Sequence, residues 1–205
     1  MKKLGHAISI GISLAGTLLC GCQTNPQSSA SPPAPPPEKS ARATWSNGYA
    51  LLYQLMTDEQ NVSKLRFFKH EQPDVKELVN RIAAASGAAA KQLEAYDKED
   101  GGLDLKNQDL PPGEQTTRDA IASTKKWDLL GHTGEHFELS LLLTQSEAMN
   151  YGWHLAEVAG KNDSRPERAC YLAGLSEQMK GFYQDIYRLM LSRIKTAPAD
   201  SSLEK

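Results

Sequence analysis

The sequence has little of several features that would narrow its function at once. The chain of 205 residues has three cysteines, 7% aromatic residues and a formal net charge of −2. A charge so close to zero excludes a nucleic-acid binder that works through a large basic surface. Only one apolar run of any length occurs, at residues 7–19, which excludes a membrane protein with several spans. The length suits one or at most two domains and is ample for burying a core.

The N-terminal region has the layout of a secretory signal peptide. Lys2 and Lys3 precede the apolar run of residues 7–19, and a basic segment before about 7–15 apolar residues is typical of such peptides. The run is shorter than the roughly 20 residues that a membrane-spanning helix needs. We therefore expect the segment to be removed rather than to remain as a membrane span.

The end of this run carries a more specific pattern, Leu19-Cys20-Gly21-Cys22. It resembles the lipobox of bacterial lipoprotein precursors, in which an aliphatic residue, one further residue and a small residue precede the modified cysteine. The resemblance implies cleavage after Gly21 and a lipid on the Cys22 thiol, and several acyl chains make a durable anchor. Cys20 fits less well, because the residue before it is a leucine. A soluble secreted protein that is cut nearby is the alternative.

The resemblance also implies a destination and leaves one free thiol. Gln23 follows the modified cysteine, at a position where aspartate would retain an enterobacterial lipoprotein in the inner membrane. We therefore expect an outer-membrane protein that faces the periplasm. Lipidation leaves only Cys170, which is too few for an internal disulfide, so the fold depends on its core. We expect Cys170 to pack as a small hydrophobic side chain.

Composition divides the chain into four segments: a signal peptide at residues 1–21, a tether at 22–43, a folded domain at 44–195 and a polar tail at 196–205. The tether holds a cluster of prolines at Pro26, Pro32, Pro33, Pro35, Pro36 and Pro37. Such a cluster favours extended polyproline II at ~3.1 Å per residue. The tether would hold the domain up to roughly 60 Å from a membrane.

Apolar residues recur at three- and four-residue steps through four stretches of the domain, as amphipathic helices require. The expected helices cover residues 45–70, 73–96, 114–159 and 166–195. Thr44, Pro73 and a capping box of Ser164 and Glu167 mark helix starts. The connection at residues 97–113 is long enough for a crossover or a lid. With no strand pattern, the sequence predicts an all-α fold, an antiparallel four-helix bundle.

The third helical stretch contains a weak point. Its expected buried stripe comprises Trp127, Leu130, Gly134, Phe137, Leu141, Thr144, Ala148, Tyr151, Leu155 and Val158. Gly131 and Gly134 each weaken a helix by about 1 kcal/mol relative to alanine. We therefore expect a kink or a short break between these two glycines.

A second pattern, His-x-x-Glu-His, is formed by His132, Glu135 and His136. It resembles the motif of the inverted zinc proteases, in which two histidines bind zinc and the glutamate activates water. Those proteases resemble large α/β chains with a further glutamate ligand far downstream, and this chain ends too soon for that. The motif also overlaps the two glycines. A metal-dependent hydrolase at these residues is therefore a minor alternative.

The helical part is similar in architecture to ferritin-like secreted proteins of bacteria. Ferritin-like bundles bind two irons through glutamates, with Glu-x-x-His on two helices, and this pattern occurs nowhere in the sequence. Glu59, Glu147 and His154 are the remaining candidate metal ligands. The structural alternative is a buried Glu59 paired with a basic neighbour such as Arg66, and a histidine at the edge of the core.

Two further groups of residues are expected to be structural. Glu138 and Gln145 lie on one flank of the third helical stretch, where we expect hydrogen bonds between helices rather than a ligand site. Trp45, Tyr49 and Tyr53 lie close to the tether, and we expect them to pack into the core.

These observations favour a protein that is not an enzyme. The sequence has no nucleophile elbow and no phosphate-binding glycine loop. We expect a lipid-anchored envelope protein whose bundle binds an envelope protein, a cell-wall component or a small ligand, without a cofactor and without nucleic acid. The two metal-based functions stay open as alternatives.

Overall fold

The structure is a computed structural model that describes residues 38–65, 71–100 and 103–196. It contains five helices, α1 (Glu38–Leu65), α2 (Pro73–Asp100), α3 (Pro112–Gly131), α4 (Gly134–Asn162) and α5 (Pro166–Thr196). No strand occurs within these ranges, so the predicted all-α class is confirmed. None of the helices described is both long enough and apolar enough to span a bilayer. The predicted signal peptide, Cys22, Arg66 and the tail from residue 197 lie outside the described residues.

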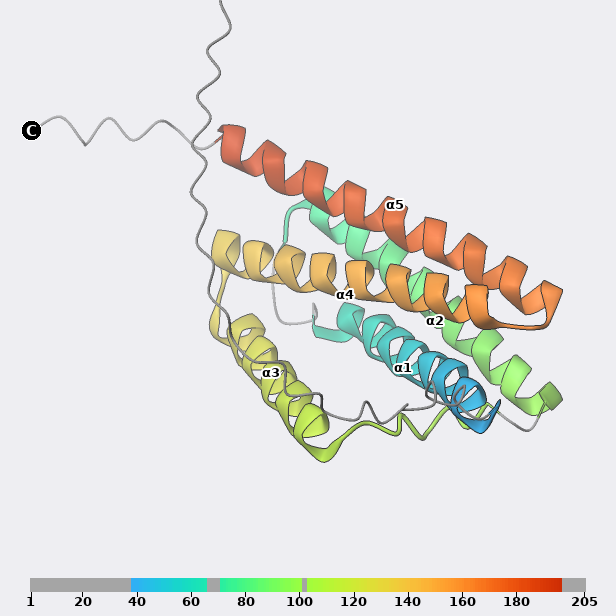
Figure 1. Ribbon diagram of the computed structural model, residues 1–205. Helices are drawn as coiled ribbons and strands as arrows, with labels where there is room; N and C mark the ends of the chain where they lie inside the picture. The colour runs from blue at the N-terminus through green and yellow to red at the C-terminus, as the bar shows by residue number, and fades with distance from the viewer. Residues whose placement is uncertain (1–37, 66–70, 101–102, 197–205) are drawn as a thin grey trace, which may run out of the picture. The chain divides into compact units, whose positions relative to one another are not determined.

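Four of the helices form the predicted antiparallel bundle (Figure 1). α1 and α5 each pack against both α2 and α4, so α2 and α4 lie at opposite corners of the bundle and run in the same direction. The chain must therefore return along the bundle between them. α3 makes this return on the outside, and among the helices described it packs against α4 alone (Figure 1).

Several helix boundaries differ from the prediction. α1 begins at Glu38, so Thr44 is not its N-cap and residues 38–43 do not belong to the tether. These six residues contain no proline and several good helix formers, which lets the helix begin at Glu38. α2 continues to Asp100, which shortens the predicted connection of residues 97–113 to residues 101–111.

The predicted weak point is a complete break. α3 ends at Gly131, and His132 and Thr133 are extended, with φ of −95° and −137°. α4 then begins at Gly134 with φ of +58°, a conformation that glycine adopts without the strain that a side chain would bring. The third stretch of the sequence is therefore two helices.

The predicted stripe follows the buried face of α4 for only part of its length. Phe137, Leu141 and Ala148 are buried as predicted, whereas Tyr151 and Val158 are 37% and 55% exposed. A stripe that repeats every 3.5 residues drifts by about 20° in each seven residues relative to an α-helix, so it leaves the buried face toward the end of α4. Trp127, predicted on the same stripe, lies on α3 and is 69% exposed.

The core lies between the four bundle helices. Its largest fully buried side chains are Tyr49, Leu52, Met56, Ile82, Leu93, Leu103, Phe137, Leu141, Leu142, Met149, Leu172 and Ile186. Each contributes about 1.5–3 kcal/mol by burial. Close packing also needs Gly152 of α4, where an added Cβ would lie 2.7 Å from Met179 Sδ and 2.9 Å from Leu55 Cδ2. α3 adds only Leu129 to the buried set.

The aromatic residues near the start of α1 pack as predicted. Tyr49 is fully buried, and the Trp45 ring meets it edge-on at a centroid distance of 5.7 Å. The Tyr53 hydroxyl donates a 2.7 Å hydrogen bond to Glu94 of α2. The guanidinium of Arg168 lies over the Trp45 ring at 5.2 Å, which joins α5 to this cluster.

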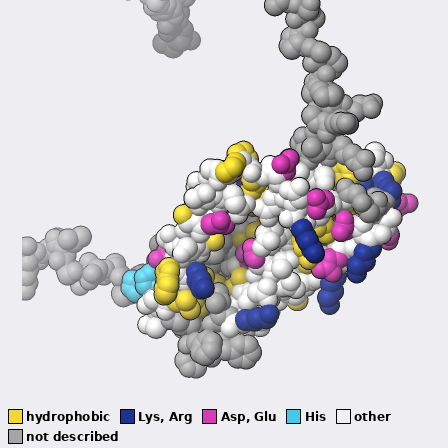
Figure 2. Space-filling view, turned by 90° about the horizontal axis from the view of Figure 1, so that it is seen from below, with side chains coloured by type: hydrophobic (Ala, Val, Ile, Leu, Met, Phe, Trp, Pro, Cys, Tyr) yellow, Lys and Arg dark blue, Asp and Glu magenta, His cyan; other side chains and the backbone are white. Residues whose placement is uncertain are grey.

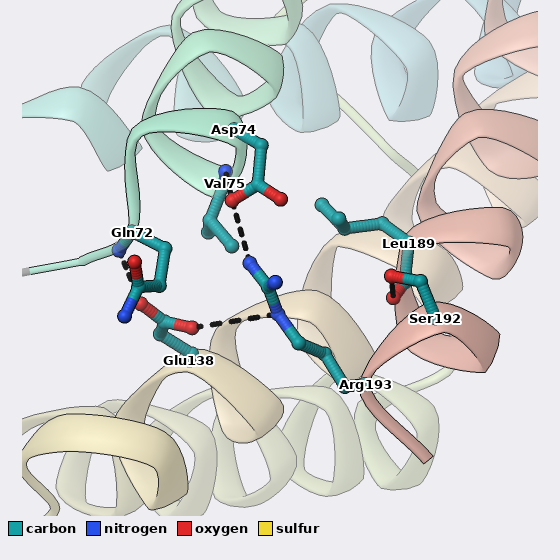
Figure 3. A network of polar contacts seen from close by, with 7 residues as sticks. All are labelled: Gln72, Asp74, Val75, Glu138, Leu189, Ser192 and Arg193. Carbon is teal, nitrogen blue, oxygen red and sulfur yellow. Dashed lines mark hydrogen bonds and ion pairs between the residues drawn. The ribbon is translucent and has the colours of Figure 1, made fainter. Parts of the chain in front are cut away.

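A polar network around Glu138 and Arg193 ties three helices at one end of the bundle (Figure 3). Glu138 of α4 accepts a hydrogen bond from the backbone N–H of Gln72, just before α2. Arg193 of α5 donates to Asp74 of α2 at 2.5 Å, and its Nε lies 4.0 Å from Glu138 Oε2. The prediction that Glu138 takes part in hydrogen bonding between helices is confirmed.

Asp163 stabilises the opposite end of the bundle, in the turn between α4 and α5. Its fully buried carboxylate forms a 2.8 Å ion pair with Arg168 and accepts hydrogen bonds from the Tyr49 hydroxyl and the Arg165 backbone N–H. Burial alone would raise the pKa of Asp163, but these hydrogen bonds and the Arg168 charge outweigh it and hold that pKa below its usual value. The side chain that accepts hydrogen bonds at the start of α5 is thus Asp163. The sequence had predicted this role for Ser164, the next residue.

Candidate binding groove

A groove of about 730 Å³ lies between α1, α3 and α4. Its apolar lining comes from Leu51, Leu55, Ile121, Ala122, Ala148 and Tyr151, and its charged lining from Asp58, Glu59, Glu114, Arg118, Asp119, Lys125 and Glu147. Figure 2 looks at this side of the molecule and shows a hollow with hydrophobic side chains deep inside and acidic ones close by. The groove thus combines an apolar interior with charged walls.

The groove exists because α3 is too polar to close onto the bundle. α3 buries only Leu129, close to its C-terminal end, while Ile121 in its middle is 49% exposed. The connection before α3 is fixed instead by Leu103 and Leu105, which are buried, and by a 2.6 Å hydrogen bond from Ser46 Oγ to the Leu103 carbonyl. α3 is therefore tied to the core by Leu129 near its C-terminal end, contacts α4 through Arg118 and Lys125, and stands away from α1.

Glu59 of α1 is the buried carboxyl group of the groove. It is 5% exposed, and its Oε2 accepts a 2.6 Å hydrogen bond from Gln145 Nε2 of α4. Burial raises the pKa of Glu59 from 4.5 to about 7; the Gln145 hydrogen bond and the Lys125 charge oppose the shift, and the Asp58 charge adds to it. Both protonation states of Glu59 are therefore populated near neutral pH.

Gln145 is the partner of Glu59, and only the nitrogen of its side-chain amide has a hydrogen-bond partner. Its side chain is fully buried, and Oε1 has no hydrogen-bond partner. The expected hydrogen bond between helices at Gln145 is confirmed by its contact with Glu59. The partner proposed for Glu59 from the sequence, Arg66, lies outside the described residues.

The two cations in the groove are already engaged. Lys125 forms an ion pair with Glu147 across α3 and α4. Arg118 pairs with Glu114 at 2.7 Å, and its guanidinium lies over the Tyr151 ring at 5.2 Å. Since five carboxylates line the groove beside these two cations, the groove has an excess of negative charge.

The three carboxylates that remain have only neutral hydrogen-bond donors among the residues described. Asp58 accepts a 2.9 Å hydrogen bond from Gln54, and Asp119 one of the same length from Gln115. Glu59 accepts its hydrogen bond from the Gln145 amide. The excess negative charge is therefore not balanced by a cation in the part of the chain that the structure describes.

The candidate metal ligands Glu59, Glu147 and His154 are not gathered at one point. Glu59 and Glu147 both line the groove, but the exposed His154 ring stacks on Trp153 at a centroid distance of 4.2 Å. Its Nδ1 lies 3.6 Å from Glu157 on the same helix. Within the described ranges there is no group of three or more His, Cys, Asp or Glu side chains that is suited to hold a metal ion.

The residues of the His-x-x-Glu-His pattern lie exposed at the junction of α3 and α4. His132 is in the break and Glu135 and His136 are on α4, so the continuous helix that a zinc-protease site needs is missing. His132 Nδ1 lies 3.2 Å from Ser140 Oγ, and the two histidine rings are 6.1 Å apart. The spacing in the sequence therefore does not produce the expected shared helix face.

Cys170 is exposed on α5, outside the groove, so it does not pack as the small hydrophobic side chain that we expected. Two cations of the groove could not be expected from the predicted helices. Arg118 and Lys125 were not singled out, because α3 was taken as the first part of one long core helix. The available signal was the composition of α3, whose residues between Pro112 and Lys126 include a single large apolar side chain, Ile121.

Comparisons with protein-family models, with curated proteins and with solved structures returned no match to this chain. The groove and the N-terminal sequence are therefore the features that indicate a function.

Proposed function

We propose that this chain is a lipid-anchored protein of the bacterial cell envelope whose helical bundle binds a small ligand in the α1–α3–α4 groove, without catalysing a reaction. The groove is the observation that carries the proposal. Its volume of about 730 Å³ lies within the usual size of small-molecule sites, about 300–1,000 Å³, and such sites combine apolar walls with a few polar groups.

The position of α3 supports binding at this place. A helix that packs against one neighbour and buries one residue can move away from α1 at little cost, because few buried contacts are lost. A ligand could therefore enter between α1 and α3 without opening the four-helix core.

The lipobox supports the anchor. Cys22 would carry the lipid, and the bundle begins at Glu38. The proline-rich residues between them would span up to about 50 Å as polyproline II. This places the groove away from the membrane surface, on the periplasmic side of the outer membrane under the sorting rule noted above.

The anchor is tested by mass spectrometry of the protein produced in a bacterium. We expect an N-terminal peptide that starts at Cys22 and carries acyl groups, and a protein that is found with the membranes. Cys22→Ser should remove the acyl mass and release the protein, whereas Cys20→Ser should change neither. A mature N-terminus elsewhere, without lipid, would refute the anchor.

The groove is tested with a fragment library of cationic, neutral and anionic compounds, followed by NMR on the full-length protein. We expect ligand-induced shifts at residues that line the groove. Ala122→Trp, which puts an indole into the groove, should abolish them. Ala120→Trp is the matched control, since Ala120 is exposed on the same helix but does not line the groove. Shifts that are the same in both variants, or no shift at the groove with any fragment, would refute the proposal.

A further inference from the structure

We infer that the groove selects small organic cations, namely a primary ammonium group carried on an apolar body, and that Glu59 is the counter-ion of this ammonium. The inference rests on the proposed function and adds the chemical class of the ligand. It is carried by three features of the groove: its charge, the buried carboxyl group of Glu59 that lines it, and its apolar wall.

The charge of the groove favours a cation over an anion. Lys125 and Arg118 are held by Glu147 and Glu114, so an anionic ligand would have to take them from these partners. It would also face the carboxylates that have no cationic partner among the described residues. A cation faces no such competition, and like charges at close range are strongly unfavourable in a partly desolvated site.

Glu59 is the buried carboxyl group that lines the groove, and it holds one hydrogen bond, from Gln145. Gln145 itself is fully buried and does not line the groove. A carboxylate can accept several hydrogen bonds, whereas an ammonium group has three donors and no acceptor, so the two groups match. A hydroxyl has one donor, and a carboxylate ligand has none.

The walls beside Glu59 suit the rest of such a molecule. Leu51 and Leu55 line the groove from the same helix, and Tyr151 lines it from α4. The Tyr151 ring already receives a cation, since the Arg118 guanidinium lies over it at 5.2 Å. An apolar body of a few carbon atoms would cover these side chains while its ammonium reaches Glu59.

The test uses three probes with one carbon skeleton: benzylammonium, benzyl alcohol and benzoate. Binding to the full-length protein is measured by NMR titration, with groove residues as reporters. We expect benzylammonium to bind at least about tenfold more tightly than benzyl alcohol, because a charged hydrogen bond is replaced by a neutral one, and benzoate not to bind. Glu59→Gln should weaken benzylammonium about tenfold or more and leave benzyl alcohol unchanged. Glu135→Gln, an exposed carboxylate outside the groove, is the control.

A second measurement needs no variant. Because only ionised Glu59 attracts the ammonium, the affinity of the wild-type protein for benzylammonium should rise about tenfold from pH 6 to pH 8, with benzyl alcohol unaffected. The other groups that face Glu59 are Asp58 of α1, Lys125 of α3, and Gln145 and Glu147 of α4. An affinity for benzylammonium that does not change with pH would overturn the role of Glu59.

The outcomes separate this inference from the proposed function. If benzyl alcohol or benzoate shifts the groove residues as strongly as benzylammonium does, the groove is a binding site but its selectivity for cations is wrong. If Glu59→Gln and Glu135→Gln bind benzylammonium equally well, Glu59 is not the counter-ion. If benzylammonium fails to bind while other fragments bind at the groove, the inference about cations is refuted and the proposed function is not. If no fragment binds at the groove, the inference and the proposed function are both refuted.

Discussion

Glu59 makes the stability of this protein depend on pH, and Glu59→Gln should remove that dependence. The folded-state pKa of Glu59 is about 7, raised from 4.5 by burial. Folding therefore favours the protonated carboxyl group. Its contribution to stability is fully present below about pH 4.5, declines as the pH rises toward 7, and is lost above that value, where the carboxylate must ionise inside the protein.

The magnitude follows from the size of the pKa shift. A rise from 4.5 to about 7 corresponds to about 3 kcal/mol, at 1.36 kcal/mol per pKa unit. Most of this, about 2–3 kcal/mol, falls between pH 5 and pH 8. Glutamine has nearly the shape of the protonated carboxyl group and never ionises. The stability of the Glu59→Gln variant relative to wild type should therefore increase by about 2–3 kcal/mol over the same interval.

Urea unfolding of both full-length proteins at pH 5 and pH 8 measures this difference, by linear extrapolation of the free energy of unfolding. Comparing variant with wild type removes the pH dependence of groups that the two proteins share, such as Asp163. Glu135→Gln, which changes an exposed carboxylate, should differ from wild type by less than about 0.5 kcal/mol at both pH values. If the Glu59→Gln difference were equally small and independent of pH, burial would not disfavour the Glu59 charge and the reasoning would be refuted.

Three further predictions follow from the packing. Gly152→Ala should lower the free energy of unfolding by about 1–3 kcal/mol, because its methyl would meet Met179 at 2.7 Å. Gly174→Ala, whose methyl would meet nothing within 4 Å, should raise it by about 1 kcal/mol. Equal effects of the two variants in urea unfolding would contradict this. Asp163→Asn removes the buried carboxylate charge that pairs with Arg168 and accepts from the Tyr49 hydroxyl and should cost about 3–5 kcal/mol, and a cost below about 1 kcal/mol would show that this charge is not needed. Amides of α3 should exchange with deuterium well before those of α4, measured by mass spectrometry, and equal protection would show that α3 is firmly packed.

Much of the fold was predictable because it depends on local properties of the chain. Apolar periodicity and Pro73 located four bundle helices, and two glycines three residues apart located the break between α3 and α4. The predicted role of Glu138 and Gln145 in contacts between helices is also confirmed, since polar residues on the flank of a buried stripe must find partners when helices pack. The exact helix ends were less predictable, because residues 38–43 are compatible with either a tether or a helix.

The groove was not predictable, because it depends on how helices are placed and not on which segments are helical. The alternative of a buried Glu59, which the sequence left open, is confirmed, but its partner Gln145 lies 86 positions away in the chain. The other wall is α3, whose position follows from topology: α2 and α4 run in the same direction, so one segment must return outside the bundle. A segment that returns outside the bundle needs a polar outer face, which the sequence of α3 shows, and it needs few core contacts.

An amphipathic pattern predicts a buried helix, so it assigned Trp127 to the core, whereas the structure leaves Trp127 exposed. The position of least regular periodicity is therefore where the groove forms, since a helix that lacks a full apolar face cannot close against the bundle.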